Sequence, residues 1–102
     1  MTDEDKKRIA EYMTWEEDNF FEGYRTLDGH AINFDLNDAS LCAAEMQKRG
    51  DWEYFVGDTE DTLIYTRYHK EHHSYKSFLV AWLFNAENFF TAMAEWLKEV
   101  KK

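Results

Sequence analysis

The feature that most constrains the fold of this chain is an unbroken apolar run, SFLVAWLF, at Ser77–Phe84. Side chains along a strand alternate between the two faces of its sheet, so a continuous apolar strand is stable only where both faces are covered. A helical amphipathic pattern begins directly after the run, at Asn85. We therefore expect an α+β protein, a three-layer α/β/α sandwich in which three helices cover a small antiparallel sheet.

The length and charge of the chain limit its organisation and its partners. With 102 residues and no linker-like segment, residues 1–102 are expected to form a single domain. Residues 1–60 hold 16 acidic and 6 basic side chains, whereas residues 61–102 hold 5 and 6, and the net charge is −9. Negative charge repels phosphate, so direct nucleic-acid binding is disfavoured.

Three features bear on the compartment. Cys42 is the only cysteine, so an internal disulfide is excluded, and the opening MTDEDKKRIA lacks the apolar core of a secretion signal. The longest apolar run has eight residues, which is well below the roughly 18 that a membrane span requires. These features predict a soluble, cytoplasmic protein.

Three segments have the spacing and capping residues of helices. The first begins at Thr2 or Asp3 and ends near Trp15, and the second runs from an Asp35 N-cap to Gly50. The third is capped by Asn85, and one of its faces is apolar: Phe89, Met93, Trp96, Leu97 and Val100.

Two further regions have the composition of strands. Phe20–Leu27 and His30–Phe34 flank Asp28-Gly29, which suits a two-residue hairpin turn. Alternation at Trp52, Tyr54 and Val56, followed by a turn-like GDTE and then Leu63–His69, predicts a second hairpin. That hairpin would continue through residues 70–76 into the apolar run, giving a three-stranded meander.

A rival interpretation makes Ser74–Lys102 one long helix. We favour a strand followed by a helix, because the apolar run mixes β-branched and aromatic residues and an N-cap residue follows it.

Three segments of the sequence resemble those of a known family. IAEYMTW at residues 9–15, DLNDA at residues 35–39 and NAENFFTAMAEWLKEV at residues 85–100, with β-rich sequence between the last two, resemble small phage and prophage proteins of the "phage ABA sandwich" domain type. The resemblance implies an α/β/α sandwich of viral or mobile-element origin, and that family has no established activity or catalytic residues. The acidic segment Glu16–Glu22 and the His-rich loop Lys70–Tyr75 depart from its pattern.

His69, Glu71, His72 and His73 are the nearest approach to a metal site in the sequence, because imidazole and carboxylate groups bind zinc and related ions. The adjacent His72 and His73 diverge in an extended or looping backbone, and the common zinc spacings are missing. His30 would join these residues only through the fold. The ordinary interpretation is a solvated connection between strands.

Catalytic motifs are also missing from the sequence. Ser74 follows His73, but no G-x-S-x-G elbow surrounds it, and there is no glycine-rich phosphate loop. Cys42 falls on the apolar face of the second helix, where a thiol behaves as a small hydrophobe. We expect neither enzymatic activity nor a cofactor.

Two groups of carboxylates accompany aromatic residues and are the candidate partner-binding sites. Acidic side chains steer a basic surface towards aromatic rings that supply contact area. The ordinary interpretation is a solvated acidic surface, with the aromatic rings in the core. The candidate residues are Trp15, Glu16, Glu17, Asp18, Glu22, Asp58, Glu60 and Asp61, with Phe20, Phe21, Trp52 and Tyr54 nearby.

Three functional hypotheses follow. The first is a non-catalytic, acidic phage-type accessory protein that binds a host or phage protein, including the case of an anti-defence inhibitor that mimics nucleic acid and occupies a nucleic-acid-binding protein. The second is a small metal-dependent enzyme that uses the His69–His73 loop. The third is a structural module that forms a homodimer through its last helix or an unpaired sheet edge.

Overall fold

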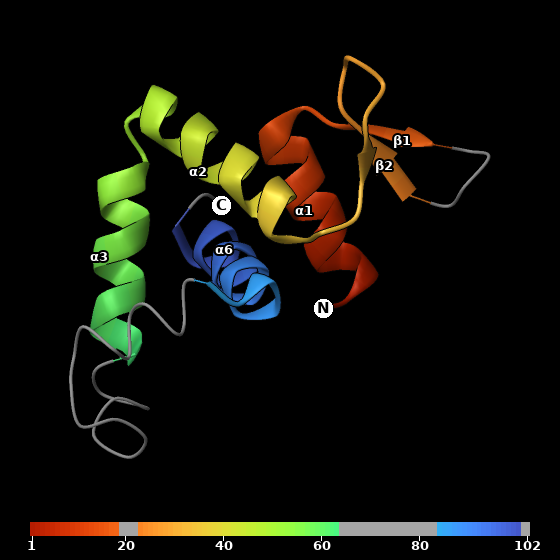
Figure 1. The fold of residues 1–102 in the computed structure, drawn as a ribbon. Coiled ribbons are helices and arrows are strands. Elements are labelled where there is room, and N and C mark those ends of the chain that lie inside the picture. Colours follow the sequence, from red (N-terminus) through yellow and green to blue (C-terminus); the bar gives the residue numbers. More distant parts are fainter. Residues whose placement is uncertain (19–22, 64–83, 101–102) are drawn as a thin grey trace.

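The computed structural model describes residues 1–18, 23–63 and 84–100, with the side chains of residues 60–63 and 100 outside that description (Figure 1). Along the chain, one helix comes first, three strands follow it, and the other described helices come after the strands. The elements are α1 (Asp3–Met13), β1 (Glu16–Asp18), β2 (Gly23–Arg25), β3 (Ala31–Ile32), α2 (Leu36–Arg49), α3 (Trp52–Leu63) and α6 (Ala86–Val100).

Helix α1 confirms the predicted first helix and is closed at its start by a capping box. The Thr2 hydroxyl accepts the Asp5 backbone N–H at 3.1 Å, and the Asp5 carboxylate accepts the Thr2 backbone N–H at 3.4 Å. The helix ends at Thr14, which takes the left-handed conformation with φ of 59°. That conformation disfavours a residue with a branched Cβ, so this C-cap is strained.

We expect Thr14→Gly to stabilise the protein by about 1 kcal/mol, because glycine adopts the left-handed region without a steric penalty. Gly50 ends α2 in the same conformation, with φ of 78°, and a Cβ there would meet no atom within 4 Å. Gly50→Ala is therefore the matched control and should destabilise by a similar amount through backbone strain alone. Urea unfolding monitored by circular dichroism measures both, and a loss of stability in Thr14→Gly would contradict this account.

Strands β1, β2 and β3 form an antiparallel sheet in that order, with Tyr24 of β2 opposite Glu17 on one side and Ile32 on the other. The predicted hairpin between β2 and β3 is present, but the loop inside its closing Thr26–His30 hydrogen bond has three residues, 27–29, instead of the predicted two. The Thr26 N–H donates to the His30 carbonyl, and the Gly29 N–H donates to the Thr26 carbonyl, both at 2.9 Å. Gly29 alone supplies the positive φ, at 92°, as in a turn followed by one left-handed residue.

Helix α2 confirms the second predicted helix at both ends. The Asp35 carboxylate accepts the Asp38 N–H at 3.0 Å, and Gly50 forms the C-cap. Asp38 is 6% exposed and its carboxylate accepts the Asn33 N–H at 2.7 Å. This hydrogen bond fixes the connection from the sheet into α2.

The hairpin predicted over residues 51–69 is wrong in its first half, because Trp52–Leu63 form helix α3. The Phe55 N–H donates to the Asp51 carbonyl at 2.9 Å, in the i to i−4 pattern of a helix. Phe55 is fully buried, and Trp52 and Val56 are half-buried against the core, whereas Tyr54 is 69% exposed, so the buried side follows helical spacing instead of every second residue. The predicted turn at residues 57–60 lies inside the helix, and residues 64–69 lie outside the described residues.

Helix α6 confirms the predicted last helix. The Asn85 side chain accepts the Asn88 N–H at 3.0 Å, and the helix begins at Ala86. Phe84 lies in a turn and is 71% exposed. One continuous helix over residues 74–102 is therefore wrong, whereas residues 77–83 of the apolar run, and the strand predicted there, lie outside the described residues.

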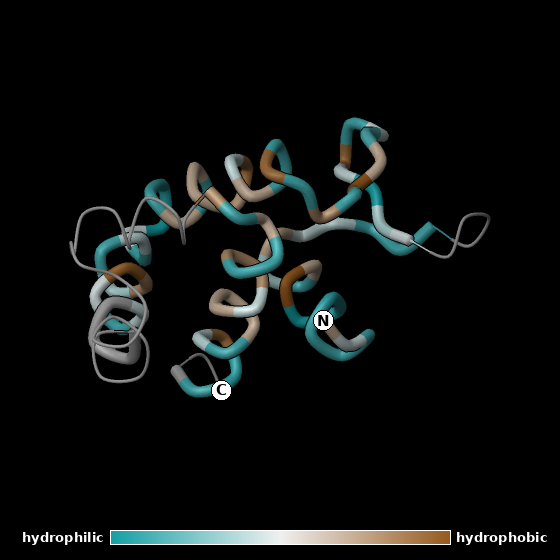
Figure 2. The backbone as a smooth tube through the Cα atoms, turned by 60° about the horizontal axis from the view of Figure 1, so that its bottom comes forward, coloured by the Kyte–Doolittle hydropathy of each residue, from teal (hydrophilic) through white to brown (hydrophobic). Residues whose placement is uncertain are grey.

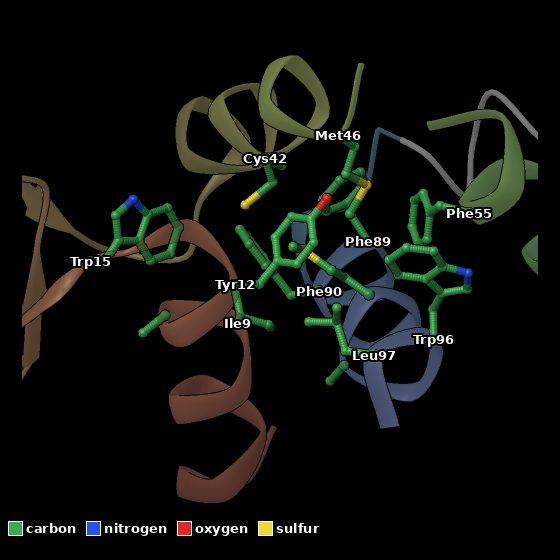
Figure 3. Packing of buried hydrophobic residues seen from close by; sticks show 14 of the residues in the cluster. Ile9, Tyr12, Trp15, Cys42, Met46, Phe55, Phe89, Phe90, Trp96 and Leu97 are labelled. Atoms are coloured by element: carbon green, nitrogen blue, oxygen red, sulfur yellow. The ribbon is translucent and has the colours of Figure 1, made fainter. Parts of the chain in front are cut away.

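The core is built around α6, which contacts α1, α2 and α3 (Figure 3). Aromatic rings meet edge to face within it: Phe34 with Phe90 at 5.1 Å and Phe55 with Phe89 at 5.5 Å between centroids. The α+β class and a small three-stranded antiparallel sheet are confirmed, although residues 16–32 supply the sheet and the described residues form four helices, not three. The sandwich layering stays a prediction.

Candidate functional site

The two groups of predicted binding residues lie at opposite ends of the molecule. Figures 1 and 2 place β1, which carries Glu16–Asp18, at the end opposite to α3, which carries Asp58. The longest principal extent of the molecule is 45 Å. The described carboxylates of the two groups, Glu16, Glu17 and Asp18 on one side and Asp58 on the other, therefore lie on separate surfaces.

The first group retains its carboxylates but not the exposed aromatic ring that we expected. Trp15 is 9% exposed and packs edge to face on Phe34, with 6.1 Å between centroids, so its ring belongs to the core. Asp18 is half-buried and forms an ion pair with Arg25. Glu16 and Glu17 are exposed. Glu22, Phe20 and Phe21 lie outside the described residues.

Carboxylates of α1 extend this first surface, and sequence reasoning missed them. Tyr24 loses hydration through partial burial and faces Glu17, Asp3 and Glu11, and these effects together raise the pKa of Tyr24 above its ordinary value of 10.0. The helical periodicity of α1 is a signal that points Asp3 and Glu11 to similar sides, but only the fold brings β1 beside them. The surface is strongly acidic and contains no exposed aromatic anchor among its described residues.

The second group keeps an exposed aromatic ring among carboxylates. Tyr54 and Asp58 are four residues apart in α3, so they lie on one side of the helix, and Tyr54 is 69% exposed. Asp58 is also held in place, because its carboxylate accepts the Trp96 indole N–H at 3.0 Å. Glu53, which we did not single out from the sequence, is exposed next to Tyr54. We call Glu53, Tyr54 and Asp58 the α3 outer face.

The charge of α3 is of one sign. Residues 51–63 contain five acidic residues and no Lys or Arg. Gly57 adds no side chain to the helix surface, and a Cβ built there would meet nothing within 4 Å. Glu60 and Asp61, which we also predicted to be binding residues, belong to α3. Their side chains lie outside the description. The α3 outer face is thus an exposed ring on an acidic helix.

An apolar groove of about 260 Å³ opens between α2, α3 and the start of α6, and no single segment of the sequence indicates it. Three helices contribute to it, and Ser40 is its one polar side chain among the residues that line it. The lining residues are Leu36, Ala39, Ser40, Ala43, Trp52, Phe84 and Phe89.

The described residues contain neither a group of side chains arranged to hold a metal ion nor an activated cysteine nucleophile. No group of three or more His, Cys, Asp or Glu side chains in residues 1–18, 23–63 and 84–100 is arranged to hold a metal ion. His30 is exposed, and the His69–His73 loop lies outside the described residues. Cys42 is fully buried, as predicted, and burial together with nearby Asp38 raises the pKa of its thiol. Such a thiol is a packing group and a poor nucleophile.

Within the described residues, no helix has the length and apolar character that crossing a membrane requires. Comparison of the chain with known protein families, curated protein sequences and solved structures found no match. The class that the structure defines is an acidic α+β protein, and the resemblance to phage ABA sandwich domains stays a prediction.

Proposed function

We propose that the protein is a non-catalytic, acidic binding protein that acts in the cytoplasm and docks onto a basic surface of a partner protein through the α3 outer face. The observation that carries the proposal is the exposed ring of Tyr54 on a helix that has acidic residues and no basic residue. A phage accessory protein that blocks a nucleic-acid-binding protein is the specific form of this proposal, supported by the family resemblance and by the sign of the charge.

The physical roles of the two kinds of side chain are distinct. Carboxylates raise the rate of encounter with a basic surface, while a tyrosine ring supplies rigid contact area and one polar atom. The opposite acidic end has carboxylates but a buried tryptophan, so it is equipped for steering and less well for contact. We therefore place the contact at α3.

The test is affinity capture from a bacterial lysate with matched variants. Glu53→Gln with Tyr54→Ala removes one charge and one exposed large side chain from the α3 outer face. Glu17→Gln with Leu27→Ala removes the same from the other end, where Leu27 is 72% exposed. We expect the α3 variant to capture at least ten-fold less of the partner than the natural chain, as quantified by mass spectrometry. The control variant should capture the same amount as the natural chain.

Salt then tests the electrostatic part. Raising ionic strength from 0.1 to 1 M shortens the Debye length from about 10 to about 3 Å, and capture should fall accordingly. An amount of captured partner that does not change with ionic strength would contradict docking at this acidic face. An equal fall in the captured amount for both variants would contradict it as well. If duplex DNA competes with the protein for the captured partner, the nucleic-acid-mimicking form is supported, and lack of competition removes it.

A further inference from the structure

We propose that the groove between α2, α3 and α6 receives the apolar side chains of an amphipathic segment of the partner, and that Lys or Arg residues flank those side chains. This inference rests on the proposed function, since it specifies how the basic partner is held. The occupant is a segment of another protein, not a second copy of this chain.

The lining of the groove selects apolar groups. Leu36 is 46% exposed and Phe84 is 71% exposed, so two large apolar side chains at its borders remain in water. Covering such apolar surface on binding removes it from water and favours association. Ser40, the one polar lining side chain, is too small to exclude an inserted aliphatic or aromatic group.

Three acidic residues, Asp35, Glu53 and Glu87, neighbour the lining residues along the chain, and we call them the acidic rim. Asp35 precedes Leu36, Glu53 follows Trp52, and Glu87 lies between Phe84 and Phe89 in the sequence. Each of the three stands at a helix N-terminus, where the macrodipole contributes about half a positive charge, so the sum at each terminus stays negative. Among described residues within two positions of the lining, the sequence has no Lys or Arg.

This charge distribution decides between occupants. A second copy would bring a like-charged rim and a net charge of −9 against the same groove, which opposes association. Nucleic acid and anionic lipid are excluded by the same sign. A segment with apolar side chains and flanking cations satisfies both the groove and its rim.

The probe is a synthetic helical peptide with a Leu/Lys amphipathic pattern, compared with a peptide in which Glu replaces every Lys. Methyl NMR follows Leu36, Ala39 and Ala43 in the groove, with exposed Ala44 of the same helix as the internal reference. We expect the Leu/Lys peptide to shift the three groove methyl signals saturably and to leave Ala44 unchanged. The Leu/Glu peptide should bind at least ten-fold more weakly.

Paired variants locate the contact. Ala43→Gln puts a larger polar side chain into the groove, whereas Ala44→Gln makes the same change at an exposed position of α2 outside the lining. We expect Ala43→Gln to weaken peptide binding at least ten-fold and Ala44→Gln to change it less than two-fold. Leu36→Ala, which removes one border of the groove, is the second variant. We expect it to weaken peptide binding too, and it serves as the test if Ala43→Gln does not fold.

Several results of the peptide experiment and of measurements on the free protein would overturn the inference. They are equal binding of the Leu/Glu peptide, equal effects of the two Gln variants, concentration-dependent dimerisation that shifts the same methyl signals, and contacts between these methyl groups and residues 77–83 in the free protein. Loss of lysate capture in the Glu53/Tyr54 variant, with normal capture in Ala43→Gln, would leave the proposed function standing and remove the groove from it.

Discussion

Replacing Phe55 with alanine is expected to lower the free energy of unfolding by about 3–5 kcal/mol, the usual cost of removing a buried phenylalanine ring. Phe55 is fully buried, and its ring lies 5.5 Å from that of Phe89 and 5.8 Å from that of Trp96, centroid to centroid. Both partners belong to α6, so the substitution opens a cavity where α3 joins the core. Urea denaturation followed by circular dichroism measures the loss.

Tyr54→Ala is the matched control for this prediction. Tyr54 is the next residue along α3, also aromatic and 69% exposed, so its removal should change stability by less than about 0.5 kcal/mol. A strand with Trp52, Tyr54 and Val56 on its inner face would reverse the order of the two effects. A larger loss from Tyr54→Ala than from Phe55→Ala would therefore contradict the helical arrangement of residues 52–63.

Stability is expected to fall steeply above pH 9, because two buried groups keep their protons in the folded state. Burial, and then nearby Asp38, raise the pKa of Cys42 above its ordinary value of 9.0. Burial, and then a hydrogen bond to the Asp51 carboxylate, raise the pKa of Tyr12 above 10.0. The unfolded chain releases both protons at the ordinary values, so the folded state binds more protons at high pH and loses stability as pH rises.

The size of this effect follows from about 1.4 kcal/mol per pH unit and per group. At pH 11 the pH lies two units above the ordinary pKa of Cys42, which is 9.0, and one unit above that of Tyr12, which is 10.0. The two contributions sum to a loss of about 4 kcal/mol in the free energy of unfolding. Urea unfolding between pH 8 and 11 measures it. Cys42→Ala should remove the slope between pH 9 and 10, and Tyr12→Phe the added slope above 10. Parallel pH profiles for Cys42→Ala and the natural chain would contradict the assignment.

Helices α1, α2 and α6 were predictable because their signals are local. Each begins with a side chain that accepts a backbone N–H three residues later: Thr2 from Asp5, Asp35 from Asp38 and Asn85 from Asn88. Such caps need no knowledge of the rest of the fold. The apolar residues that follow recur at helical spacing, so the local geometry and the hydrophobic pattern agree.

Helix α3 was missed because its local signals point elsewhere. Trp52, Tyr54 and Val56 alternate with polar residues, except that the residue between the last two is Phe55. Residues 57–60, GDTE, have the composition of a turn. What selects the helix is the burial of Phe55 against α6, more than 30 residues later in the chain, and a short-range pattern does not contain that contact.

The candidate site was only partly predictable for a similar reason. The acidic character of Glu16, Glu17 and Asp58 is evident from the sequence, but whether an adjacent aromatic ring is an anchor or a core residue depends on packing. Trp15 turned out buried and Tyr54 exposed. The apolar groove combines three helices, so its existence depends on their relative placement, and no single amphipathic pattern reveals it.

The central position of α6 has a consequence for how the protein is made. Ile9 and Tyr12 of α1 are shielded from water by a helix that begins at residue 86. A ribosome releases the chain from its amino end, at about 5–20 residues per second, so α1 emerges seconds before the helix that covers it. During translation its apolar stripe is open to chaperones, and the packing of α1 in the native core forms only after α6 has left the exit tunnel.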